Sequence, residues 1–226
     1  MRGLATSPAT RAPWTLAAAL AWSAGACSGP EPAAEAPPGE EPWTVLLAAD
    51  RLADWEATAF GGEGAIGVED DLVVLEMGSP LTGLSWTGGE LPLWDYELEV
   101  TARRLAGTDF FCGLTFPVGD SHATLILGGW GGALTGLSCL DGADASENET
   151  TTFIAYERGR EVTARVRVTR AVIETWLDGE LLHTVDIAGR SVGLRPEVLL
   201  SRPLGVASFL TRSGLGELRL RRWRER

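Results

Sequence analysis

The chain has 226 residues, a formal net charge of −12 at neutral pH, and 19 basic side chains that are all arginine. This length leaves room for one domain of about 180 residues once both ends are set aside, which is enough for a hydrophobic core. The acidic balance excludes nucleic acid and anionic lipid surfaces as partners, because both carry negative charge. Neutral sugars and cations remain compatible with such a surface.

Residues 1–27 have the layout of a secretory signal. An arginine-bearing start precedes an apolar run, Trp14 to Trp22, which is too short to span a bilayer and leads into small residues. Ala24-Gly25-Ala26-Cys27 resembles a bacterial lipobox, in which the cysteine is lipidated and becomes the first residue of the mature chain. Ordinary cleavage after an A-x-A site is the alternative, but the position of Cys27 favours lipidation. We therefore expect a lipoprotein of the bacterial cell envelope that meets the membrane only through its anchor.

Residues 28–42 are rich in Pro, Glu, Ala and Gly and contain almost nothing to bury. This composition predicts a disordered linker. The sequence thus divides into a signal peptide with a lipobox at 1–27, a linker at 28–42 and a folded domain at 43–226.

Short strands follow one another through the folded domain. Residues 96–103 alternate strictly between apolar and polar side chains, and residues 162–169 repeat the pattern. Residues 172–177 and 180–187 flank an Asp-Gly turn and form the clearest hairpin. Further strands are expected at 43–48, 72–76, 83–86, 110–116, 123–127, 205–210 and 217–223. No stretch repeats apolar residues with the helical period, so the sequence predicts an all-β fold of two packed antiparallel sheets, a jelly-roll sandwich.

Residues 107–148 combine one aromatic side chain with many polar ones. Two apolar runs flank a polar turn at 117–122, and a second turn, at 128–132, has glycines on both sides of Trp130. Because these glycines leave the indole without neighbouring side chains, we expect Trp130 to be partly exposed beside a groove, where a flat ligand could stack. A core position between the sheets is the alternative.

Cys112 and Cys139 remain once Cys27 is assigned to lipid, and export permits a disulfide between them. If the hairpins close near Asp120 and Gly131, the two thiols lie on non-adjacent strands and at different heights. A bridge requires Cα atoms within about 7 Å. The strand register therefore favours two buried free cysteines.

The same stretch, together with Trp86, Tyr96 and Trp176 at their spacings, resembles the DUF1080 family of 3-keto-disaccharide hydrolases over roughly residues 43 to 223. The resemblance implies a concanavalin- or laminin-G-like jelly roll. It also implies a reaction in which a base removes the proton at C2 of a 3-keto sugar, the glycosidic oxygen leaves C1, and water adds back. This chemistry needs a base, a cation or metal beside the enolate oxygen, and an aromatic platform for the ring.

Several polar residues could meet these needs. His122 or Glu99 could be the base, and Arg103 could be the electrophile; a solvated turn and a solvated ion pair are the alternatives for these side chains. A divalent metal is the other candidate electrophile, with loop carboxylates as its oxygen ligands, and loop acids that serve only solubility are the alternative. The metal ligands would be Asp109 and Asp120, and the sugar contacts Trp130 and Asn148.

The chain departs from the family where many members carry a glutamate, since residues 124–127 have no ionisable side chain. It also lacks the sequence motifs of serine hydrolases, nucleotide sites and structural zinc sites. Two functions therefore stay open: hydrolysis or elimination of 3-keto-glycosides, and binding of carbohydrate or a surface partner by a non-catalytic laminin-G-like module. A divalent metal or a perturbed acid on the outer sheet face favours the enzyme, and a face lined by paired Glu and Arg side chains without a convergent pocket favours the binding module.

Overall fold

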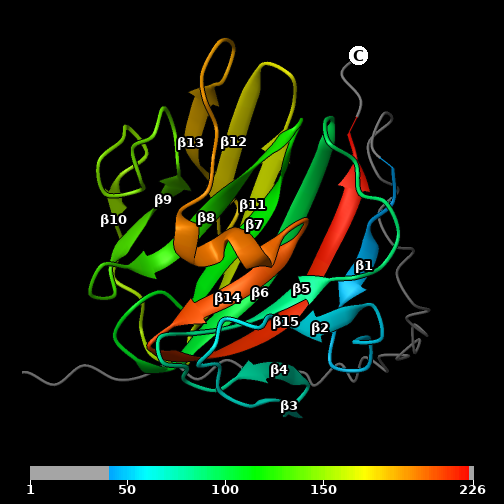
Figure 1. The fold of residues 1–226 in the computed structure, drawn as a ribbon, viewed down its shortest axis with the longest axis vertical. Helices are drawn as coiled ribbons and strands as arrows, with labels where there is room; N and C mark the ends of the chain where they lie inside the picture. Colours follow the sequence, from blue (N-terminus) through cyan, green and yellow to red (C-terminus); the bar gives the residue numbers. More distant parts are fainter. Residues whose placement is uncertain (1–40, 224–226) are drawn as a thin grey trace, which may run out of the picture. The chain divides into compact units, whose positions relative to one another are not determined.

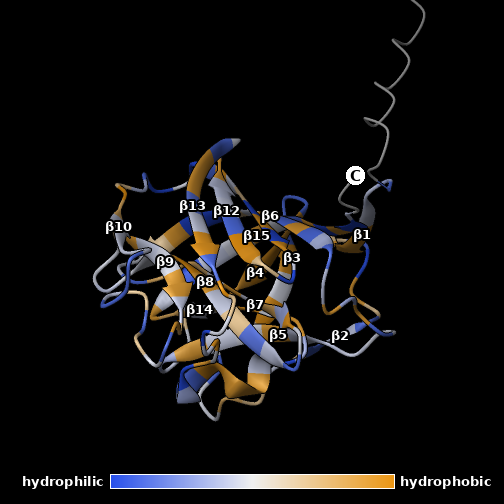
Figure 2. Ribbon diagram, turned by 90° about the horizontal axis from the view of Figure 1, so that it is seen from above, coloured by the Kyte–Doolittle hydropathy of each residue, from blue (hydrophilic) through white to orange (hydrophobic). Residues whose placement is uncertain are grey.

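The computed structural model describes residues 41–223, which form two antiparallel sheets packed face to face (Figures 1 and 2). The eight-stranded sheet has, in spatial order, β13 (Glu180–Asp186), β12 (Val172–Leu177), β11 (Glu161–Val168), β6 (Tyr96–Gly107), β15 (Thr211–Arg222), β4 (Leu72–Leu75) and β3 (Ile66–Glu69), with β1 (Thr44–Leu47) paired to β15. The seven-stranded sheet has β10 (Thr152–Phe153), β9 (Leu134–Ser138), β8 (Ser121–Gly129), β7 (Cys112–Val118), β14 (Gly205–Phe209), β5 (Leu81–Trp86) and β2 (Trp55–Ala57). The predicted all-β jelly-roll sandwich is confirmed.

The core lies between the sheets because each strand turns alternate side chains inward. On β6, Leu98, Val100 and Ala102 are buried in the core, as their alternation predicts. Leu114 on β7 and Leu125 on β8 contribute from the other sheet. The remaining side chains of these strands therefore lie on the two outer faces of the sandwich, where any binding site must be sought.

The outer face of the eight-stranded sheet is a layer of ion pairs. Glu97 is fully buried between Arg167 and Arg221, and Glu99 pairs with Arg219. Three indoles, those of Trp43, Trp176 and Trp223, lie against arginines of this layer. The alternation of Glu and Arg along these strands thus builds cross-strand pairs, as such rows usually do.

One strand, β15, runs further than the sequence indicates. β15 begins at Thr211, and its residues 213–215 pair with β4 on one side and with β6 on the other. This segment contains Ser213 and Gly214, which lack the apolar alternation that reveals a strand. A side chain at Gly214 would come within 2.9 Å of the Leu72 side chain and 3.3 Å of the Leu105 side chain, so these leucines occupy the space that a side chain there would need.

Both cysteines of the described domain are free. Cys112 on β7 pairs with Leu127 of β8, and Cys139 directly follows β9, whose Ser138 pairs with Thr124 of β8, so β8 lies between the two thiols. The prediction of free cysteines is confirmed, although Cys139 is only half-buried. The signal peptide, Cys27 and nearly all of the linker lie outside the described residues. No helix within residues 41–223 is long and apolar enough to cross a membrane.

His183 links the edges of the two sheets. Its Nδ1 lies 2.8 Å from the Thr175 hydroxyl on β12, and its Nε2 lies 3.0 Å from the Thr152 hydroxyl on β10. Burial lowers the pKa of this imidazole below its usual value. The folded protein therefore holds the neutral ring at a pH where the unfolded chain begins to bind a proton.

We expect acid to destabilise the fold through His183. Below the unfolded pKa of about 6.5, the unfolded chain binds more protons than the folded one, so the free energy of unfolding falls as the pH falls towards the folded pKa. Urea denaturation at about pH 7.5 and pH 5.5 measures this loss. His183→Gln should reduce the loss, leaving the part due to His122, whose pKa is also lowered by burial. An equal loss in variant and wild type would contradict the assignment.

Candidate functional site

The outer face of the seven-stranded sheet carries a second apolar cluster. On β8, Leu125 points into the core, so Thr124 and Ile126 point outward. The cluster consists of Leu81, Phe110, Ile126, Leu134, Ala145 and Ala207, with Phe60 and Phe209 packed against it. A short 3-10 helix, η1 (Pro196–Ser201), lies on the same face over β5 and β14 and is drawn in orange in Figure 1. Part of this apolar face stays uncovered beside η1.

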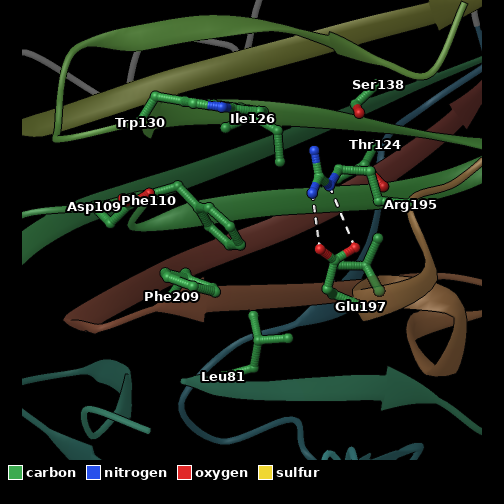
Figure 3. Close-up of a pocket in the computed structure, with 11 residues that line it drawn as sticks. Leu81, Asp109, Phe110, Thr124, Ile126, Trp130, Ser138, Arg195, Glu197 and Phe209 are labelled. Carbon is green, nitrogen blue, oxygen red and sulfur yellow. Dashed lines mark hydrogen bonds and ion pairs between the residues drawn. The ribbon is translucent and has the colours of Figure 1, made fainter. Parts of the chain in front are cut away.

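A pocket of about 240 Å³ opens there (Figure 3). It is lined by Leu81, Asp109, Phe110, Thr124, Ile126, Trp130, Ser138, Arg195, Glu197, Val198 and Phe209. Figure 3 shows the phenyl rings on one side and the pair of Arg195 and Glu197 on the other. Thr124 and Ser138, which are paired on neighbouring strands, line the charged side, but both are almost fully buried, and the Thr124 hydroxyl already bonds to that of Thr115. The arrangement offers both apolar and hydrogen-bonding surface to one ligand.

Trp130 stands at the edge of this pocket, in the turn between β8 and β9. Its side chain is 43% exposed, and its backbone has a φ of +47°, in the left-handed region. A bulky residue in that region is an outlier, and such strain persists only where the surroundings impose it. The prediction that Trp130 is partly exposed beside a groove is confirmed.

Asp109 and Arg104 impose this conformation from the two sides of the turn. The Asp109 carboxylate accepts the Gly131 N–H at 3.2 Å and the Phe110 N–H at 2.8 Å. Arg104 donates to the carbonyls of Gly128 and Gly132 at 3.2 and 2.6 Å. A side chain at Gly128 would collide with this guanidinium at 2.3 Å, so the turn closes around Arg104 only with glycine there. Asp109 therefore stabilises the turn that carries Trp130.

Arg195 and Glu197 form the charged wall. Arg195 donates to the two carboxylate oxygens of Glu197 at 2.8 and 3.3 Å, and it also donates to Asp144. Its guanidinium lies 5.8 Å from the centre of the Trp130 ring. The hydrogen bond from Arg195 lowers the pKa of Glu197, and the Glu197 hydrogen bond raises that of Arg195. Both groups are therefore charged at neutral pH, and the carboxylates outnumber the guanidinium.

The structure separates the sequence candidates. Of the site residues predicted from the sequence, only Trp130 and Asp109 line the pocket. Glu99 and Arg103 belong to the outer face of the other sheet, on the far side of the sandwich. Glu99 pairs there with Arg219 at 2.5 Å, and Arg103 pairs with Glu161 at 2.7 Å.

His122 and Asn148 have different surroundings. His122 alternates with Ala123, which is buried in the core, so it faces the same side of the sheet as the pocket without lining it. Burial, and then the charge of Arg202, lower the pKa of His122. Asn148 donates to three backbone carbonyls, those of residues 137, 143 and 144, and accepts the N–H and hydroxyl of Thr150. The Asn148 amide therefore makes its hydrogen bonds within its own part of the chain and stabilises that loop.

The two carboxylates expected to hold a metal lie apart. Asp109 precedes β7 and Asp120 follows it, so the length of the strand, roughly 20 Å, separates them. The expectation grouped them because both belong to the polar set of residues 107–148 around Trp130. Within the described part of the chain, no group of three or more His, Cys, Asp or Glu side chains is placed to hold a metal ion.

Sequence reasoning missed Arg195 and Glu197. Both follow the last hairpin, far along the chain from Trp130, and only the path of residues 188–202 over the outer face brings them to it. The local signal there is Pro196, which is typical of the first turn of a helix. It does not indicate which part of the sheet that helix contacts.

No protein-family model matches the chain, and no curated protein matches its sequence. The chain is similar in structure to the Crh5 transglycosylase in complex with NAG, with a TM-score of 0.56 and 12% identity over 83% of this chain and 88% of that one. It is also similar to the metal-free Emp46p carbohydrate recognition domain, with a TM-score of 0.51 and 15% identity over 76% and 89% of the two chains. These likenesses show the jelly-roll fold. Membership of the DUF1080 family is not shown.

Proposed function

We propose that this chain is a carbohydrate-binding module whose pocket beside η1 holds a neutral glycan. The observation that carries the proposal is the exposed indole of Trp130, held in a strained turn beside the pair of Arg195 and Glu197. Sugar rings offer apolar C–H faces that pack on an indole and hydroxyl groups that bond to charged and hydroxylated side chains. Two structurally similar proteins add support, one named as a carbohydrate recognition domain and one solved with NAG.

The charges around the pocket favour a neutral ligand. Asp109 and Glu197 line the pocket, and Asp144 lies behind Arg195, which is the one cation among the lining residues. The whole chain is acidic as well, with a net charge of −12. An anionic sugar would meet repulsion from both sources, whereas a neutral sugar would accept hydrogen bonds from Arg195 and donate to the carboxylates.

The same charges favour binding over glycoside hydrolysis. Hydrolysis by paired carboxyl groups needs one of them to keep its proton at neutral pH, which requires a raised pKa. Glu197 has the opposite shift because Arg195 stabilises its charged form. Asp109 already accepts two backbone N–H groups. Glu197 is therefore not set up as a proton donor, and the Asp109 carboxylate is engaged in holding the Trp130 turn.

Elimination of a 3-keto-glycoside is a second candidate, and His122 favours it. The imidazole faces the same side of the sheet as the pocket, and its lowered pKa leaves it neutral and able to accept a proton near pH 7. The purified chain would be incubated with a 3-keto-glucoside, with and without a divalent metal, and release of the aglycone followed. Aglycone release that is lost in His122→Ala would support the enzyme. Absence of release with every divalent metal tested would contradict the enzyme and favour the binding module.

Affinity electrophoresis tests the binding function itself. The purified chain would be run in gels containing a panel of neutral polysaccharides and, separately, the anionic polymer polygalacturonate. We expect retardation in at least one neutral gel and none in the anionic one. Mobility that stays unchanged in every neutral gel, or retardation only by the anionic polymer, would contradict the proposal.

We also propose that the chain is exported and anchored in the bacterial cell envelope through lipid on Cys27. The order of arginine, apolar run, small residues and cysteine supports this. Cys27→Ser should move the protein from the membrane fraction to the soluble fraction, because the lipid is the only expected anchor. Cys139→Ser is the matched control and should stay with the membrane. Unchanged fractionation of Cys27→Ser would refute acylation.

A further inference from the structure

The pocket has two chemically different halves. Its apolar half comprises Leu81, Phe110, Ile126 and Phe209, with the Phe110 and Phe209 ring centres 5.7 Å apart. These side chains belong to the outer-face cluster and stay outside the core between the sheets. Its polar half comprises Thr124, Ser138, Arg195 and Glu197, and Figure 3 shows these side chains gathered away from the phenyl rings.

An unsubstituted sugar matches only one of these halves. Its hydroxyl groups find partners at Arg195 and Glu197. Any hydroxyl turned towards Phe110 and Phe209 would lose its bonds to water without gaining others, which disfavours binding. An apolar group in that half would instead leave water and contact the two rings.

Resting on the proposed carbohydrate binding, we infer that the ligand is a glycoside with an aryl aglycone. The sugar binds the polar half, and the aglycone lies against Phe110, Phe209 and Leu81. The volume is sufficient for the aglycone, because a cavity of about 150 Å³ accepts a benzene ring and the pocket has about 240 Å³. The acidic residues of the pocket favour a neutral sugar, and its apolar half favours an aglycone without an acidic group.

Matched glycosides test the inference. Methyl and phenyl glycosides of the same sugar and anomer, drawn from glucose, galactose, mannose and N-acetylglucosamine, would be titrated into the full chain by calorimetry. For the sugar that binds, we expect the phenyl glycoside to bind on the order of tenfold more tightly than the methyl glycoside, because the ring buries apolar surface. Phenol alone should bind more weakly than the phenyl glycoside.

The outcomes distinguish a failure of the aglycone inference from a failure of the proposed carbohydrate binding. Equal affinity for methyl and phenyl glycosides would overturn the aglycone while carbohydrate binding stands. Phenol binding as tightly as the phenyl glycoside would also overturn it, since the sugar would then contribute nothing. If no glycoside binds, both proposals fail together.

A variant localises the preference. Phe209→Ala should abolish the preference, so that the phenyl and methyl glycosides bind the variant with equal affinity. Phe153→Ala removes the same side chain from an exposed site on β10, outside the pocket, and should keep the preference. A preference that survives Phe209→Ala unchanged would overturn the placement of the aglycone.

Discussion

Replacing Trp130 with alanine is expected to weaken glycan binding at least tenfold, which corresponds to about 1.4 kcal/mol. The indole supplies the largest apolar face at the pocket mouth, and tryptophan is among the residues that most often dominate a binding energy. Stability should change by less than about 1 kcal/mol, because the side chain is 43% exposed and lies outside both apolar clusters. Calorimetric titration gives the first quantity and urea denaturation the second.

Phe153→Ala is the control for this variant. Phe153 is an aromatic side chain, 74% exposed, on the same sheet but outside the pocket. Its removal should alter neither glycan affinity nor stability. Wild-type affinity in a folded Trp130→Ala protein would show that the indole is no platform for the sugar.

Removal of the Glu97 carboxylate is expected to cause the largest loss of stability. Glu97 is fully buried and lies 2.7 Å from a nitrogen of Arg167 and 2.5 Å from one of Arg221. Glu97→Ala leaves these two guanidinium groups facing each other without the anion between them. Breaking a buried pair in this way costs about 3 kcal/mol or more. Urea denaturation at neutral pH measures the fall in the free energy of unfolding.

Glu161→Ala is the matched control on the same face. Its carboxylate pairs with Arg103, and both side chains are well exposed, at 49% and 38%. Water screens such a pair, so the loss should stay below about 1 kcal/mol. Comparable losses in Glu97→Ala and Glu161→Ala would show that burial adds nothing to the Glu97 interactions.

The fold could be predicted because strand alternation is a local property. Leu98, Val100 and Ala102 occupy every second position, and a sheet with one buried face requires that spacing. The start of β15 escaped prediction because Ser213 and Gly214 suit a crowded central position, where small side chains replace the apolar pattern.

The site could be predicted only where a local feature exposes a side chain. Glycines around Trp130 indicated an exposed indole, and the structure places it there. The row of Glu99 and Arg103 looked equally suitable, because alternation tells which residues share a face without telling whether a pocket lies on it. Arg195 and Glu197 reach Trp130 through the path of a loop, which depends on tertiary packing and leaves no periodic trace.

Nuclear magnetic resonance with the neutral glycan that binds tests the central claim most directly, because it reports the place of binding. On titration, we expect the indole N–H of Trp130 and the amides of Ser138 and Glu197 to shift together with one dissociation constant. The amides of Glu99 and Arg103, across the sandwich, should stay in place. Shifts centred on Glu99 and Arg103, with none at Trp130, would contradict the assignment of the pocket beside η1 as the glycan site.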